Sequence, residues 1–112
     1  MRDEDRIRIL HMIEAAESAL SFVAGRERAD LDRDRMLLFG VVRAIEVIGE
    51  AAGRVSEDTR IIASEIPWTA IVSMRNRLIH AYFDIDRDIV WQTVTEEIPA
   101  LLPSLRALLP GQ

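Results

Sequence analysis

Four segments of the chain place apolar residues at the i, i+3, i+4, i+7 spacing of a helix that buries one face. They cover residues 3–24, 31–54, 67–82 and 87–109. No segment alternates apolar and polar residues in the way that marks a half-buried strand. Residues 60–65 add a short helical stretch before the third long segment. The pattern therefore predicts an all-α fold, an antiparallel four-helix bundle with an additional short helix.

Local signals predict where several of these helices begin and end. Gly25 follows the last apolar position of the first segment and is placed to cap it. Asp30 or Asp32 could serve as the N-cap of the second helix, and Ser56 could open the short segment. Asp86 ends the loop before the last helix and is placed to cap it. Proline suits the first position of a helix because its missing N–H has no intrahelical partner there. We therefore start the third long helix at Pro67.

Prolines and glycines inside the predicted helices have consequences for packing. Pro99 and Pro103 lie within 87–109 and should kink or break that helix. The second helix contains Gly40, Gly49 and Gly53, which lower its intrinsic stability but permit another helix to approach closely. We expect that close approach to be intramolecular rather than across a dimer.

Length and composition set limits on the class of protein. A chain of 112 residues with 49% hydrophobic content fits one domain, residues 1–112, with a substantial core. It has no cysteine, and no apolar run approaches the roughly 20 residues that span a bilayer. The charged N-terminal residues do not resemble a signal peptide, so we expect a cytoplasmic protein with no membrane partner. The net charge of −5 argues against nucleic-acid binding by bulk electrostatics, although a local basic site remains possible.

The side chains best suited to phosphate binding and proton transfer are concentrated in one octet, Arg75 to Tyr82. If 67–82 is one helix with Ile71, Met74 and Leu78 at its back, Asn76 and His80 fall together on its front. Arg75 and Tyr82 then lie along one flank. By this pattern His80 is not a core residue but faces solvent or another chain.

The octet reads R-N-x-x-x-H-x-Y and resembles the signature of the HepT-like ribonucleases of the HEPN superfamily, which are toxins of two-gene toxin–antitoxin modules. The preceding Pro67-Trp68, the acidic loop that follows and Trp91 extend the likeness over nearly the whole chain. The resemblance implies a HEPN-like fold and a homodimer with a composite active site. It also implies a partner antitoxin, a minimal nucleotidyltransferase that adds AMP to the tyrosine of the motif, here Tyr82.

The residue types in the octet fit metal-independent cleavage of RNA, in which the 2′-OH attacks its own phosphate. Histidine is suited to proton transfer because its unperturbed pKa is about 6.5, and arginine stays charged and can bind two phosphate oxygens. We expect His80 to move the proton and Arg75 to hold the phosphate. Asn76 would orient His80 or the substrate, and Arg77 would contribute to substrate binding. This reaction uses neither a metal nor a cofactor.

The sequence is also consistent with several other interpretations. The octet could be a polar helix end with no catalytic role, or the chain could be a purely structural helical dimer. It could also be a non-catalytic module that docks a nucleotidyltransferase and uses Arg75, Arg77 and His80 to hold a nucleotide. A metalloenzyme is disfavoured because His11 and His80 lie on different helices without an evident shared carboxylate.

Three further features have plainer interpretations. Glu46 and Glu50 form an i, i+4 carboxylate pair, but no histidine or third acid accompanies them at ligand spacing. We interpret this pair as part of a solvated helix face. His11 lies opposite the apolar face of the first helix, where a surface histidine is expected. Trp68 is expected to anchor the core.

Overall fold

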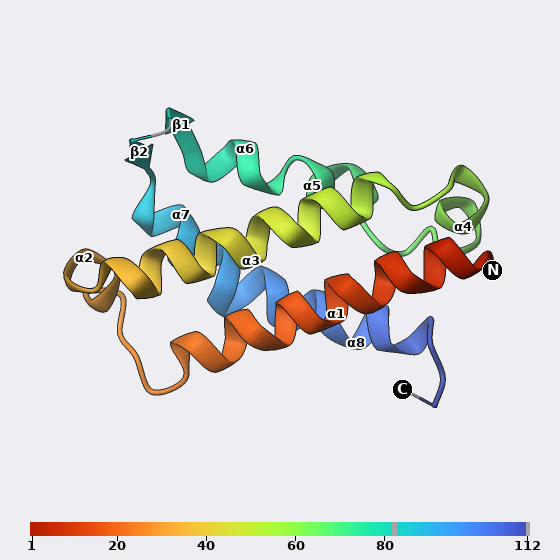
Figure 1. Ribbon diagram of the computed structural model, residues 1–112, viewed down its shortest axis with the longest axis horizontal. Coiled ribbons are helices and arrows are strands. Elements are labelled where there is room, and N and C mark those ends of the chain that lie inside the picture. Colours follow the sequence, from red (N-terminus) through yellow and green to blue (C-terminus); the bar gives the residue numbers. More distant parts are fainter. Residues whose placement is uncertain (82, 112) are drawn as a thin grey trace.

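Helices make up most of the described chain, residues 1–81 and 83–111 of a computed structural model (Figure 1). In chain order the helices are α1 (Asp3–Val23), α2 (Asp30–Arg33), α3 (Arg35–Gly53), α4 (Glu57–Ile62), α5 (Trp68–Val72), α6 (Met74–Leu78), α7 (Arg87–Gln92) and α8 (Ile98–Ala107). A π-helical segment, η1 (Thr93–Glu97), joins α7 to α8. A small antiparallel hairpin of β1 (Ile79–Ala81) and β2 (Asp84–Ile85) follows α6.

The helices run back and forth along the longest dimension of the molecule, which measures 42 × 29 × 20 Å. In Figure 1, α3 returns beside α1, and α5 and α6 then run back along α3 toward the hairpin. The α7–η1–α8 segment makes the last return and packs on α1, while α4 lies at the opposite end from the hairpin. The predicted all-α bundle of four main helical runs and a short helix is therefore confirmed.

One hydrophobic core lies between these helical runs. The fully buried large side chains come from nearly every helix and include Ile9, Met12, Leu31, Val41, Ile45, Ile48, Ile66, Ile71, Leu78, Val90, Ile98 and Leu105. The apolar stripes predicted for the first three long segments supply most of them. Trp68 is also buried, and its indole Nε1 donates to the Ala63 carbonyl at 3.0 Å, so the expected anchor is confirmed.

Two predicted caps are present. Gly25 has a φ of +73°, a left-handed conformation that glycine adopts without steric cost just beyond the end of α1. Ser56 precedes α4, and its side chain accepts a hydrogen bond from the Thr59 N–H. The short helix therefore begins at Glu57, earlier than the residues 60–65 expected from the sequence.

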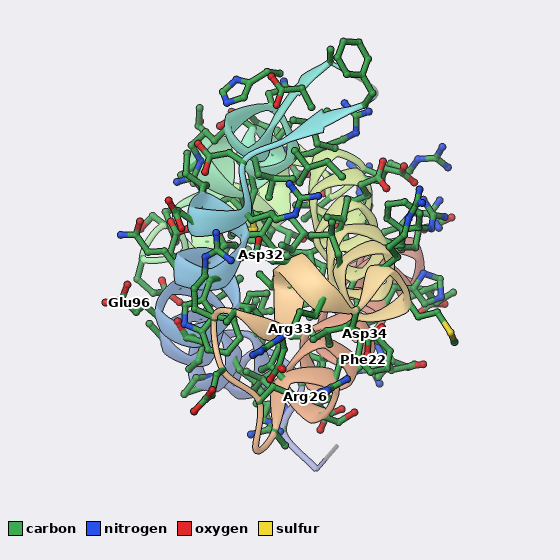
Figure 2. The ribbon with its side chains drawn as sticks, turned by 90° about the vertical axis from the view of Figure 1, so that its left-hand side faces the viewer. Phe22, Arg26, Asp32, Arg33, Asp34 and Glu96 are labelled. Atoms are coloured by element: carbon green, nitrogen blue, oxygen red, sulfur yellow. The ribbon has the colours of Figure 1, made fainter. Side chains whose placement is uncertain are left out.

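The second long segment is divided, which corrects the prediction of one helix over 31–54. Asp34 takes an extended conformation between α2 and α3, and it caps α3 by accepting from the Leu37 N–H at 3.0 Å. The expected cap at Asp30 or Asp32 is therefore wrong for this helix. Arg26 lies near Asp34 at the α2 end of the molecule (Figure 2) and donates to it at 2.6 Å. The Leu37 N–H and then Arg26 lower the pKa of Asp34.

The third long segment also differs from the single helix predicted over 67–82. Pro67 is the residue before α5 rather than its first position. Ser73 separates α5 from α6, and its hydroxyl donates to the carbonyls of Thr69 and Ala70, a back-bonding pattern that bends helices. The chain then leaves the helix after Leu78 and enters β1.

The last segment shows the interruption that its prolines predict. Pro99 has no N–H to donate to a carbonyl one turn back, and its ring crowds that turn. The chain widens into the π-helical turn η1 immediately before Pro99, whereas Pro103 is accommodated within α8. Among residues 1–81 and 83–111, no helix has the length and apolar character needed to cross a membrane.

The close approach predicted at the glycines of α3 is intramolecular at Gly49. A Cβ added there would lie 3.3 Å from the Ile71 carbonyl oxygen and 3.5 Å from that of Val72. Gly49 thus lets α3 contact the backbone of α5. A Cβ at Gly53 would meet nothing within 4 Å.

Candidate functional site

The predicted octet spans the junction between α6 and the hairpin. Arg75, Asn76 and Arg77 lie on α6, whereas His80 lies on β1. Asn76 and His80 therefore do not share a helix face, which corrects the arrangement expected from one continuous helix. Tyr82 lies outside the described residues, so its predicted modification by an antitoxin stays a prediction.

The chain turns into β1 because its tertiary contacts favour an extended backbone there. The Leu78 carbonyl accepts from the Asp86 N–H at 2.8 Å, and Ile79 pairs with Ile85 across the hairpin. Both isoleucines are half-buried and pack against the core. The hairpin projects beyond the helices, as both views show (Figures 1 and 2), and this places His80 on an exposed edge.

Arg75 is held by a carboxylate of the neighbouring helix. Its Nε donates to Glu46 Oε2 of α3 at 2.9 Å, and the arginine side chain remains 47% exposed. Within the described part of the chain, its two terminal nitrogens make no other hydrogen bond. A guanidinium fixed at Nε with both terminal nitrogens open is oriented to bind a phosphate through two oxygens.

Asn76 lies next to Arg75 on an exposed part of α6. Its backbone N–H donates to the Ser73 carbonyl at 3.0 Å, and its side chain lines a cavity together with Arg75. No hydrogen bond joins its side chain to His80 among the described residues. Of the two predicted roles, contact with substrate suits this placement better than orientation of His80.

His80 faces a carboxylate of the following loop. Its Nε2 lies 3.6 Å from Asp86 Oδ2, and its side chain is 56% exposed. Asp86 is itself fixed, because its other oxygen, Oδ1, accepts from the Ile89 N–H at the start of α7. The aspartate that the sequence indicates as a helix cap therefore also faces the imidazole, and the distance is that of an ion pair when His80 is protonated.

Arg77 points away from this pair toward the last helical run. Its terminal nitrogen NH1 donates to Glu97 Oε1 of η1 at 3.0 Å. Arg75 and Arg77, two residues apart on α6, are thus held by carboxylates from α3 and η1 respectively. Among the described residues, no hydrogen bond joins Arg75 to His80.

The sequence does not predict two contacts of this site. They are the contact of Glu46 with Arg75 and that of Asp86 with His80. The sequence predicts that Glu46 belongs to a solvated face with Glu50, yet it is the partner of Arg75. It is separated from Arg75 by 29 positions, so only the packing of α3 on α6 brings the two together. An acidic residue on the α3 face that packs on α6 was the available signal. Both carboxylates would hold basic groups in place while leaving them accessible to a ligand.

A helical bundle with an accessible arginine and an accessible histidine, each beside a carboxylate, belongs to the class of proteins whose side chains can bind a phosphate and transfer a proton. Comparison with known proteins identifies the family within this class. The family described as "Ribonuclease HepT-like" matches residues 12–108. The chain belongs to this family, as the resemblance in the octet suggested.

Individual relatives agree with the family assignment. "Probable ribonuclease HepT" of Thermococcus cleftensis is 46% identical over 68 residues, which cover 61% of this chain and 62% of that protein. "Putative RNase TTE0752" of Caldanaerobacter subterraneus subsp. tengcongensis is 34% identical over 99 residues, which cover 88% of each chain. No solved structure matches the chain.

Proposed function

We propose that this protein is a metal-independent endoribonuclease and the toxin of a toxin–antitoxin module. The observation that carries the proposal is the pairing of Arg75 with Glu46 and of His80 with Asp86 in a HepT-like chain. Both basic side chains remain accessible to a ligand while a carboxylate limits their orientation. Cleavage of a phosphodiester requires such groups, a cation that binds the phosphate and a side chain that transfers a proton.

In the proposed reaction, the 2′-oxygen of a ribose attacks the adjacent phosphorus and the bond from phosphorus to the 5′-oxygen breaks. A base takes the proton of the 2′-OH, and an acid gives a proton to the departing 5′-oxygen. The products are a 2′,3′-cyclic phosphate and a 5′-hydroxyl. His80 transfers the proton, Arg75 neutralises the charge that develops on the phosphate oxygens, and Asn76 and Arg77 bind the substrate.

A homodimer would complete this site. The reaction needs a base and an acid, whereas the octet has a single histidine, His80. The other histidine, His11, is exposed on α1. Two octets facing each other across a two-fold axis would bring two histidines and two arginines into one cleft. The projecting hairpin supports this arrangement, because Phe83 exposes a large apolar side chain beside the histidine-bearing strand.

The partner we propose is a nucleotidyltransferase antitoxin that transfers AMP from ATP to the hydroxyl of Tyr82, releasing pyrophosphate. The basis is the position of Tyr82, two residues after His80 in the octet. An added AMP would attach a phosphate and a bulky base two residues along the chain from His80. Its phosphate would then compete with the RNA phosphate for the basic groups of the octet.

The test is cleavage of total RNA or tRNA by the purified protein in excess EDTA. We expect the wild type to cut, and we expect Arg75→Ala and His80→Ala each to lower the rate by about 100-fold or more. Arg106→Ala is the matched control, because Arg106 forms an exposed ion pair with Glu17, away from the octet.

The mass of intact protein is measured in parallel, with and without the co-expressed partner. Absence of cleavage by unmodified wild type would favour the non-catalytic module that holds a nucleotide or docks a partner. Absence of cleavage together with the added mass of AMP would identify a silenced toxin. An unchanged mass after co-expression would contradict modification of Tyr82.

A further inference from the structure

A cavity of about 360 Å³ lies between α3 and the α5–α6 segment, directly beside the proposed phosphate-binding residue Arg75. Arg75 and Asn76 line it from α6, α3 contributes Glu46 and Glu50, and Arg54 follows directly after the end of α3. Glu46 and Glu50 lie one turn apart along one face of α3, and the C-cap residue Arg54 follows four positions later. The cavity therefore leads from the proposed cleavage site along α3 to Arg54.

The hollow exists because α3 carries glycines where it faces α5. At Gly49 the backbone of α5 lies so near that a Cβ would be 3.3 Å from the Ile71 carbonyl oxygen. One turn further, Gly53 also lines the cavity, and a Cβ there would meet nothing within 4 Å. The space in front of Gly53 is thus open to a ligand. The apolar side chain of Val72 forms part of the opposite wall and is 40% exposed.

Some of the charged side chains along the cavity already have an ion-pair partner within the described part of the protein, and one does not. Glu46 is bound to Arg75 at 2.9 Å, and Glu50 lies 3.6 Å from Arg43, which stands outside the cavity. Arg54 is exposed, and its guanidinium has no ion pair or hydrogen bond among the described residues. The cavity therefore has one unpaired cation at the end far from Arg75 and a loosely paired carboxylate between them.

We propose that this cavity is the subsite for the nucleotide that flanks the scissile bond, with Arg54 on its phosphate and Glu50 on its base. The inference rests on the proposed ribonuclease function and adds to it a determinant of substrate preference. Val72 supplies an apolar contact for the base, and Gly53 leaves the space that the base occupies. Arg75 holds the scissile phosphate at one end, and Arg54 holds the neighbouring one.

A carboxylate at this position selects among bases. An ionised glutamate only accepts hydrogen bonds, so it pairs with the exocyclic amino groups of cytosine, adenine or guanine. Uracil has a carbonyl oxygen where cytosine has its amino group. Apart from its ring N–H, it therefore offers Glu50 no hydrogen-bond donor. The subsite should therefore disfavour uridine beside the cleaved bond.

The base preference is measured with short strands that are 2′-O-methylated at every nucleotide except one, so that only one bond can be cleaved. The base on each side of that bond is varied in turn. We expect the wild type to cleave strands with uridine in the flanking position at least about fivefold more slowly than those with cytidine. Because glutamine also donates, Glu50→Gln should reduce this difference to less than about twofold, while Arg106→Ala should preserve it.

The phosphate contact is measured by binding rather than by cleavage. Single-stranded RNA is titrated against His80→Ala and against the double variant His80→Ala/Arg54→Ala at several salt concentrations. Each phosphate contact to single-stranded nucleic acid contributes about 0.7 to the slope of log K against log salt. We expect the double variant to bind more weakly and with a slope smaller by about that amount.

A third variant tests the hollow itself. Gly53→Leu places a side chain in the open space without meeting other atoms at its Cβ, so the fold should persist, as circular dichroism would verify. We expect its cleavage rate at low substrate concentration to fall about tenfold through a higher KM. If the wild type cleaves RNA but these variants change neither its base preference nor its salt slope, the proposed subsite is wrong and the proposed function stands. A wild type that cleaves no RNA would overturn the proposed function and, with it, this inference.

Discussion

At the scale of single residues, the site depends on carboxylates that hold basic side chains in place. Asp86 has two such tasks, since one oxygen accepts from the Ile89 N–H and the other lies 3.6 Å from His80 Nε2. The loop that precedes α7 is therefore coupled to the orientation of the imidazole. Glu46 has the corresponding task for Arg75.

Replacing Asp86 by asparagine should separate these two tasks. Asparagine caps helices about as well as aspartate, so the stability of the fold should change little. The imidazole loses its charged partner, and we expect kcat for RNA cleavage to fall at least about tenfold with KM nearly unchanged. The matched control is Asp84→Asn, an exposed aspartate of the same hairpin. Equal loss of activity in both variants would contradict a specific positioning role.

Asp5 is a second carboxylate with a defined environment, and it stabilises the fold rather than the site. It is 2% exposed, and its oxygens accept from the Ser56 N–H, the Ser56 hydroxyl and the Thr59 hydroxyl. Burial, the largest single influence, raises the pKa of Asp5, but these hydrogen bonds together lower it below its usual value. The ionised form is therefore favoured by folding.

The consequence is a dependence of stability on pH. Because the pKa of Asp5 is lower in the folded chain, its ionised carboxylate stabilises the fold at pH values above its pKa in the unfolded chain, about 4. This contribution is lost as the pH falls through the pKa of the folded chain. Asp5→Asn should lower the free energy of unfolding by about 2 kcal/mol at neutral pH. Thermal melts from pH 7 to 3 should show this difference narrowing in acid. A constant difference would contradict the account.

Sequence patterns identified the residues whose roles are local and missed those whose partners are distant. The Ser56 cap depends on a neighbour three positions away, and Gly25 on its own backbone conformation. The Glu46–Arg75 pair joins two helices, and no periodicity within either helix reveals it. Asp86 was recognisable as a cap but not as the neighbour of His80.

At the scale of elements, the junctions of α3 with its neighbours determine where the site lies. Gly49 permits the contact between α3 and the α5 backbone, and this contact in turn sets the distance from α3 to α6. The position of Arg75 relative to Glu46 depends on that distance.

A matched pair of substitutions tests this contact. Gly49→Ala places a Cβ 3.3 Å from the Ile71 carbonyl oxygen, which can move only with the backbone of α5, so we expect a loss of about 1 kcal/mol. Gly53→Ala meets nothing within 4 Å and should be neutral or stabilise by up to about 1 kcal/mol, because alanine favours the helix. Chemical denaturation of both variants provides the measurement. Equal stabilities would show that the close approach is not needed.

The sequence predicts where the long helical segments lie, but it predicts only some of the places where they are interrupted. The apolar stripes of α1 and α3 and the break before Pro99 follow from the sequence pattern. The exit from α6 after Leu78 does not, because no glycine or proline follows Leu78 to mark a helix end, and the pairing of Ile79 with Ile85 makes this segment a strand. The Asp34 cap was missed because three nearby aspartates had equal local propensity for that role.

At the scale of the whole molecule, the helical runs bring α6 and the hairpin to one end and one face of the bundle (Figure 1). The overall charge of −5 opposes RNA binding at long range, so affinity must come from local arginines. A proposed dimer would concentrate them by joining two copies of the octet.

A dimeric active site predicts that activity depends on protein concentration. If two octets form one cleft, the cleavage rate per chain should fall on dilution below the dissociation constant of the dimer. Sedimentation over the same concentrations should show the dimer giving way to monomer as that rate falls. A monomer at micromolar concentration that retains full activity would contradict the composite site.

The most direct test of the central claim compares two substrates that differ by one oxygen atom. One is an RNA with a mapped cleavage site, and the other carries a 2′-deoxynucleotide at that site. Both are incubated with unmodified wild-type protein in excess EDTA, and the product ends are determined. We predict cleavage of the RNA alone, with a 2′,3′-cyclic phosphate on the product. Cleavage of the deoxy substrate at the same bond, or loss of all cleavage on adding EDTA, would contradict metal-independent attack by the 2′-OH.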